Sequence, residues 1–76
     1  MSPGQIRAAR SLLGLSQSEV ANVTGLSIPT IKRAESDQGI KASRAAAAAI
    51  CRALEAAGVE FTNGDAPGVR LSRRSQ

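Results

Sequence analysis

The side chains best suited to chemistry in this sequence are cations in its middle part. Lys32 and Arg33 are adjacent, and Lys41 and Arg44 follow shortly after. The 76 residues include ten basic and six acidic side chains, which gives a net charge of +4. This balance suits a polyanionic partner, although a solvated basic surface without any partner has the same composition.

The sequence argues against catalysis and against metal binding. It contains no histidine, and Cys51 is its single cysteine. We find no carboxylate pair at a plausible spacing, no nucleophile beside a base and no phosphate-binding loop. Cys51 lies in an alanine-rich run, where a small core residue is the expected interpretation. We therefore expect a protein that is not an enzyme and uses no metal and no cofactor.

Nothing in the sequence indicates a membrane or secreted protein. No apolar stretch approaches the length of a transmembrane helix. The first residues lack a signal-peptide pattern, because Arg7 and Arg10 interrupt any apolar run. We therefore expect a cytoplasmic protein without membrane contact.

The first element expected is a helix that begins at Ser2 or Pro3 and ends at Gly14. Serine caps exposed amides, proline fits the first helical position, and glycine ends a helix in the left-handed conformation. Apolar residues recur at helical spacing and mark its expected buried face: Ile6, Ala9, Leu12 and Leu13.

The stretch from Leu15 to Gly39 predicts two short helices joined by a tight turn. Ser16 and Glu19 have the spacing of a capping box, and this helix should run to about Val23. Gly25 then makes the turn. The next helix should begin at Ser27 or Ile28, with Pro29 in its first turn, and end before Gly39.

This second helix of the pair should have one apolar and one basic face. Ile31 and Ala34 are expected to face inward, and the solvent-facing set is Thr30, Lys32, Arg33 and Ser36. Two helices joined in this way, the second one basic, are typical of a helix-turn-helix module, whose second helix lies in the major groove of DNA.

A polar loop at residues 37–42 should lead into a long helix. We expect Ser43 to cap it, the five alanines 45–49 to make it firmly helical, and Gly58 to follow Ala57 as its C-cap. Its expected buried face consists of Ile50, Ala53, Leu54 and Ala57.

After residue 58 the apolar period changes from helical to alternating. Val59 and Phe61, then Val69 and Leu71, flank a turn over residues 63–68, which predicts a β-hairpin. A lone hairpin is barely stable in water, so these four side chains must pack on the helices, pair with a second subunit, or do both. We thus expect a helix-turn-helix domain at 1–58, a hairpin at 59–72 and a basic tail at 73–76.

The pattern resembles the lambda/434 repressor and Cro-like helix-turn-helix family, often called the XRE family, over about residues 3–58. The matching positions are Leu15 to Ala21, Gly25, Ser27 to Ile31 and Glu35. The resemblance implies a mainly α, lambda-repressor-like domain of four helices. The terminal hairpin is similar to that of very short bacterial members of the family.

The resemblance assigns base contacts to Ile28, Pro29, Lys32 and Arg33. Arg33 is the best candidate, because a guanidinium can bond the O6 and N7 atoms of guanine together. Ile28 and Pro29 offer no side-chain hydrogen bonds, unlike the polar residues of many relatives, and are suited only to a thymine methyl group. An ordinary solvated face is the alternative for Lys32 and Arg33.

The resemblance also implies a structural ion pair between Arg10 and Glu35, which would tie the first helix to the recognition helix. Gln17 would bond a DNA phosphate, although first-turn polarity alone explains a glutamine there. Ser43 is likewise explained by capping alone. The full set of phosphate contacts implied is Ser16, Gln17, Thr30, Lys41, Ser43 and Arg44.

The sequence therefore favours a dimeric repressor that binds an inverted-repeat operator in double-stranded DNA. The homodimer would use the fourth helix, the hairpin, or both. The alternative is a protein-binding role, as an antitoxin that caps a toxin or an antagonist of another regulator. The apolar start of the recognition helix, Ile28 and Pro29, suits such a protein partner.

Overall fold

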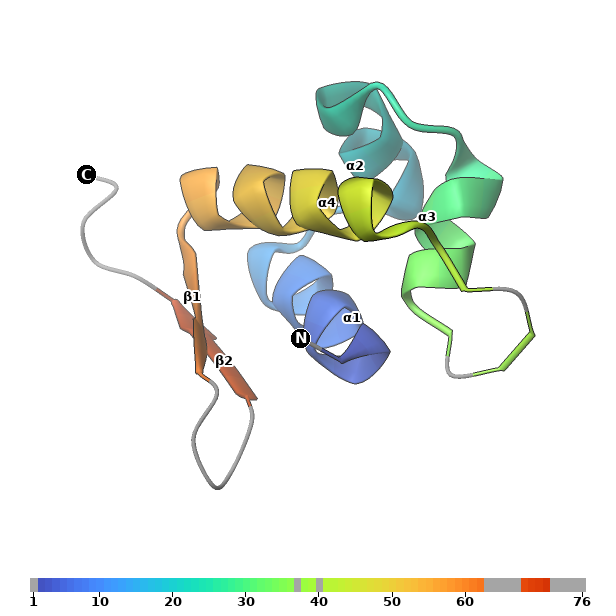
Figure 1. Ribbon diagram of the computed structural model, residues 1–76. Coiled ribbons are helices and arrows are strands. Elements are labelled where there is room, and N and C mark those ends of the chain that lie inside the picture. Colours follow the sequence, from blue (N-terminus) through green and yellow to red (C-terminus); the bar gives the residue numbers. More distant parts are fainter. Residues whose placement is uncertain (1, 37, 40, 63–67, 72–76) are drawn as a thin grey trace.

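The computed structural model describes residues 2–36, 38–39, 41–62 and 68–71 (Figure 1). Its elements follow in the order α1 (Pro3–Leu13), α2 (Gln17–Thr24), α3 (Ile28–Ala34), α4 (Arg44–Ala56), β1 (Val59–Thr62) and β2 (Gly68–Leu71). Four helices and an antiparallel hairpin confirm the fold class predicted from the sequence. Residues 63–67 of the predicted hairpin turn and the basic tail fall outside this description, and Gly68, expected in the turn, begins β2.

Serine caps begin the helices where the sequence places them. Ser2, Ser16, Ser27 and Ser43 each accept a hydrogen bond at the side-chain oxygen from a backbone amide in the first turn of the helix that follows. The ends of α1 and α2 also match the prediction. Gly14 has a φ of 71° and Gly25 a φ of 75°, left-handed conformations that favour glycine.

The end of α4 differs from the prediction. The helix closes at Ala56, and its C-cap is Ala57 in the right-handed conformation rather than Gly58. Ala57 is consequently exposed and not part of the buried face. After Ala57 the chain passes through Gly58, which has a φ of 119°, and enters β1.

The core lies where the four helices meet. Ala9, Ile31 and Ile50 are fully buried, and Leu54, Val20 and Ile6 are nearly so. Leu12, however, is 45% exposed, so its placement in the buried stripe of α1 was wrong. At about 100° per residue, Leu12 lies about 120° around the helix axis from Ile6 and therefore falls outside the face that meets the core.

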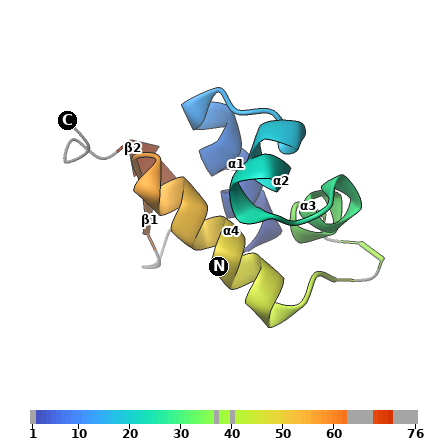
Figure 2. The same ribbon diagram turned by 90° about the horizontal axis from the view of Figure 1, so that it is seen from above.

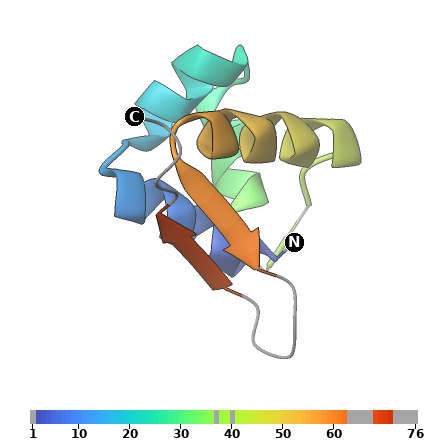
Figure 3. The same ribbon diagram turned by 90° about the vertical axis from the view of Figure 1, so that its left-hand side faces the viewer.

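The hairpin packs on the helices as an extra layer at the end of α4 (Figure 3). Its register pairs Val59 with Leu71 and Phe61 with Val69. Val59 is buried, while Phe61 and Val69 pack partly buried against the core. Leu71 stays 55% exposed, so the single chain covers three of the four apolar hairpin residues.

Gln5 joins α1 to the hairpin, a role that the sequence pattern does not reveal. Its amide oxygen accepts a hydrogen bond from the Ser2 amide at 2.8 Å, which closes a capping box. Its amide nitrogen donates to the carbonyl oxygens of Thr62 at 2.9 Å and Gly68 at 3.1 Å. One buried side chain thus satisfies backbone groups on three segments, including both strands at the turn end of the hairpin.

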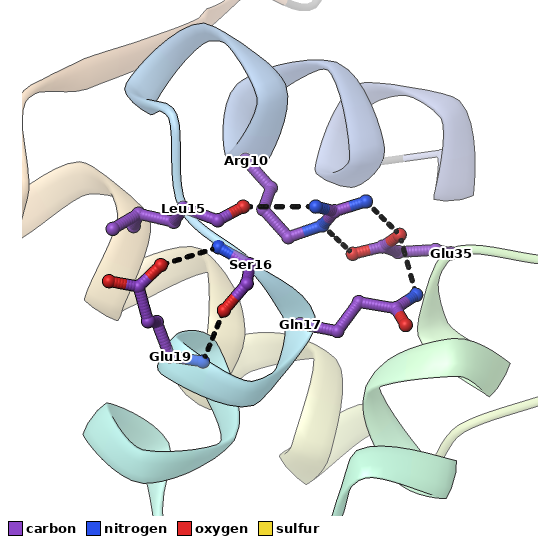
Figure 4. A network of polar contacts seen from close by, with 6 residues as sticks. All are labelled: Arg10, Leu15, Ser16, Gln17, Glu19 and Glu35. Atoms are coloured by element: carbon purple, nitrogen blue, oxygen red, sulfur yellow. Dashed lines mark hydrogen bonds and ion pairs between the residues drawn. The ribbon is translucent and has the colours of Figure 1, made fainter.

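An ion pair between Arg10 and Glu35 braces α1 against the end of α3 (Figure 4). Arg10 donates from Nε to Glu35 Oε2 at 2.6 Å and from Nη2 to Oε1 at 3.1 Å. Its Nη1 donates to the carbonyl oxygen of Leu15 at 2.9 Å. The hydrogen bond to Glu35 raises the pKa of Arg10, so the guanidinium stays charged wherever the protein is folded.

We predict that Gln5→Ala lowers the free energy of unfolding by about 1–3 kcal/mol, because it leaves the carbonyl groups of Thr62 and Gly68 without their donor. Urea unfolding followed by circular dichroism measures this change. Gln38→Ala, at an exposed glutamine, is the control and should change stability by less than about 0.5 kcal/mol. Equal stability of the two variants would contradict the role of Gln5.

We predict that Glu35→Gln destabilises the fold by about 3 kcal/mol, since it leaves a largely buried guanidinium without its counter-charge. Glu60→Gln provides a matched control, because Glu60 pairs with Arg70 at the same 2.6 Å but on the surface. That exposed pair should contribute at most about 1 kcal/mol. Denaturant unfolding at neutral pH compares the two, and a similar loss in both would refute the brace.

Candidate nucleic-acid interface

The recognition helix and the hairpin lie at opposite ends of the molecule. In Figures 1 and 2, α3, the loop that follows it and the start of α4 lie on the right, whereas β1 and β2 lie on the left. The candidate residues of α3, the loop and α4 therefore belong to the end of the domain away from the hairpin.

Helix α3 has the two faces predicted for it. Ile31 is fully buried and Ala34 is 5% exposed, so this side is fixed against the core. Lys32 and Arg33 are exposed, as are Ile28 and Pro29 in the first turn. The proposed base-contacting residues are thus all accessible, and the buried face determines which way they can point.

The start of α2 carries its predicted capping box. Ser16 donates its backbone N–H to Glu19 Oε1 at 2.8 Å, and Glu19 donates its own to Ser16 Oγ at 3.0 Å. Hydrogen bonding from Ser16 to the Glu19 carboxylate, first through the backbone and second through the side chain, lowers the pKa of Glu19. The Glu19 carboxylate therefore occupies a backbone amide at the helix start that an anion could otherwise bind.

Gln17 does not extend freely into solvent. It is half-buried, and its Nε2 donates to Glu35 Oε1 at 3.3 Å, so the amide adjoins the Arg10–Glu35 pair (Figure 4). An amide nitrogen carries two N–H groups, and one remains for another acceptor. This contact joins residues 18 positions apart, and no sequence signal indicates it.

Two further candidates have capping partners. Thr30 is half-buried, with its Oγ1 2.8 Å from the Oγ of Ser27 at the start of α3. Ser43 Oγ accepts from the Ala46 amide at 3.1 Å and so caps α4. Both hydroxyl groups have a structural role already, which any phosphate contact would have to share.

Four exposed cations take part in no salt bridge among the described residues. Within the described ranges, the salt bridges are those of Arg10 with Glu35 and of Arg70 with Glu60. Lys32, Arg33, Lys41 and Arg44 take part in neither, and all four are exposed. Helix α3, the loop and the start of α4 thus supply positive charge at one end of the domain, and no salt bridge among the described residues neutralises it. Arg70 lies at the other end, and Arg73 and Arg74 are outside the described residues.

The structure also bears on metal binding and on the single cysteine. Among the residues it describes, no three histidine, cysteine or acidic side chains are grouped as metal ligands would be. Cys51 packs partly buried against the core, and burial raises the pKa of its thiol. No described helix is long and apolar enough to cross a membrane.

Comparison with known proteins agrees with this geometry. A family model described as a helix-turn-helix domain matches residues 4–62, which spans all four helices and β1. No curated protein sequence matches the chain. The match covers well over half of the sequence and includes the capped helix pair, its glycine turn and the basic recognition helix. The chain therefore belongs to the XRE-type helix-turn-helix family of DNA-binding regulators.

Proposed function

We propose that this protein is a sequence-specific transcriptional repressor that inserts α3 into the major groove of its operator. The observation that carries the proposal is the exposed basic side of α3. Lys32 and Arg33 lie on the solvent side of a helix whose other side is buried, and the exposed cations Lys41 and Arg44 follow it. The phosphate backbone of DNA is attracted to such a basic face, and a helix of this size fits the major groove.

Arg33 reads a guanine in this proposal, through two hydrogen bonds to O6 and N7. Lys32 takes a neighbouring base edge. Ile28, 40% exposed, and Pro29 meet thymine methyl groups, because neither side chain has a donor or an acceptor.

Phosphate contacts fix the domain on the duplex without reading its sequence. Gln17 uses its second amide N–H for this purpose while Glu35 holds the first, so the Arg10–Glu35 pair orients it. The remaining members of the proposed set are Ser16, Thr30, Lys41, Ser43 and Arg44.

We predict that Arg33→Ala loses about 1–3 kcal/mol of discrimination between operator and unrelated duplex, as expected for a lost bidentate base contact. Gln17→Ala and Lys41→Ala should instead weaken binding to all duplexes alike. Arg52→Ala controls for loss of a charge, because Arg52 is exposed on the outer side of α4. Operator sequences selected from random duplexes and fluorescence anisotropy across a salt series measure these effects. An unchanged preference in Arg33→Ala would refute its assignment.

The protein acts as a homodimer in this proposal, joined at the hairpin end. Leu71 and Leu12 are 55% and 45% exposed, and β2 runs alongside α1 toward the end that carries Leu12 (Figure 3). A two-stranded sheet also has unpaired edges that a second copy can extend. Because α3 lies at the other end, pairing here leaves both recognition helices free for grooves about 34 Å apart in an inverted repeat.

We predict that Leu71→Glu converts the dimer to a monomer without unfolding it, since this side chain is mostly exposed within one chain. Val23→Glu is the matched control, because Val23 is 68% exposed on α2 and should leave the dimer intact. Sedimentation equilibrium at micromolar concentrations distinguishes the two. A wild-type protein that is monomeric there would exclude the homodimer, and a dimer lost only in Val23→Glu would exclude the hairpin as its interface.

One observation favours a second candidate, the binding of a protein such as a toxin or another regulator. Ile28 is an exposed apolar side chain at the start of the recognition helix, followed by the equally apolar Pro29. Binding to duplex DNA weakens steeply as the salt concentration rises, because each phosphate that the protein neutralises releases counterions. Failure to bind any duplex at low ionic strength would favour the protein partner.

A further inference from the structure

A cavity of about 170 Å³ lies between the start of α1, the end of α3, the following loop and the start of α4. Its floor includes Ile6 from α1, Ala34 from α3, and Ala42 and Ala47 before and within α4. Arg33 and Lys41 also line it. Two parts of the chain that are far apart in the sequence, the start of α1 and the stretch from the end of α3 to the start of α4, thus line one partly open apolar hollow with two cations.

The lining combines two chemistries that a ligand must match together. Ile6 and Ala34 are almost completely buried, and Ala42 and Ala47 are half-buried, so the floor is apolar. Arg33 and Lys41 are exposed, and neither belongs to a salt bridge within the described ranges. Inorganic phosphate has no apolar surface to bury on the floor, and a neutral apolar molecule has no charge to pair with the cations. An anion with a compact apolar body uses both.

The volume limits the size of such a ligand. At about 30 Å³ for each water of the liquid, the cavity corresponds to five or six waters. Sites for drug-sized ligands measure about 300–1,000 Å³. The cavity is therefore too small for a nucleotide or a long acyl chain and suits a small organic acid. A planar carboxylate also matches the paired N–H donors of an arginine.

We propose that this cavity binds a small organic carboxylate, with its apolar body on the alanine floor and its carboxylate between Arg33 and Lys41. Both cations are also among the residues to which the proposed function assigns DNA contacts. A bound carboxylate would hold the Arg33 guanidinium and compete with the duplex. This regulatory consequence depends on the proposed function, whereas binding of the acid itself does not.

Benzoate is a suitable probe, and the experiment uses the full chain without DNA. Titration followed by ¹⁵N–¹H spectra should give saturable shifts at Ala34, Ala42 and Ala47. The variant with Arg33→Gln and Lys41→Gln together should weaken benzoate binding at least tenfold. Ala47→Leu, which fills the floor and keeps both charges, should weaken it similarly. Arg52→Gln removes an exposed charge elsewhere on α4 and should leave it unchanged.

Comparison ligands decide what the cavity recognises. Benzamide has the same body without the charge and should bind at least tenfold more weakly than benzoate. Equal binding of benzamide, or equal loss in Arg52→Gln, would overturn the proposal. Inorganic phosphate that binds as well as benzoate would show a pocket for a DNA phosphate instead and would also overturn it. So would the absence of saturable shifts at these alanines.

Competition with DNA tests the regulatory consequence separately. Saturating benzoate should weaken operator binding at least fivefold in the wild type and not in Ala47→Leu. Benzoate that binds the cavity without affecting the operator would exclude this regulation. A protein that binds benzoate but no duplex would refute the proposed function and leave the carboxylate site standing.

Discussion

The ion pair of Arg10 and Glu35 is the constraint on which the recognition helix depends. Helix α3 spans only Ile28–Ala34, and so short a helix is marginal without tertiary support. Glu35 ends it, and Arg10 holds that residue from α1 while bonding the Leu15 carbonyl just before α2. A buried ion pair gives little net stability, because desolvation offsets the attraction. Its value here is orientation: one guanidinium sets three segments relative to one another, and Gln17 joins through the same carboxylate.

Gln5 has the corresponding role at the other end of the domain. Four of the ten buried hydrophobic residues in the described ranges are alanines, and Phe61, the one aromatic residue of the chain, is only partly buried, so apolar burial alone gives the hairpin limited support. Gln5 adds two hydrogen bonds to the strands while it caps α1. The hairpin and the recognition helix are therefore both fixed to α1, at different residues.

Most of the fold is predicted by sequence signals that act over a few neighbouring residues. The four capping serines, Gly14 and Gly25 determine helix limits through bonds within one turn, so the sequence alone locates them. The alternation of Val59, Phe61, Val69 and Leu71 likewise predicts the hairpin. The errors came where burial depends on neighbours far along the chain. Leu12 lies two turns from Gln5 on the same side of α1, yet the polar residue is buried by the hairpin and the apolar one is not.

The sequence by itself determined the types of element, their order, and the basic character of the third helix. These follow from periodicity, capping and composition, which act over a few residues. Tertiary structure alone decided that Gln17 bonds Glu35, that Gln5 binds both strands, and that Arg33 and Lys41 line one cavity with Ile6. Such contacts join positions separated by many residues, and they exist only once the packing of the helices has fixed the direction of each side chain.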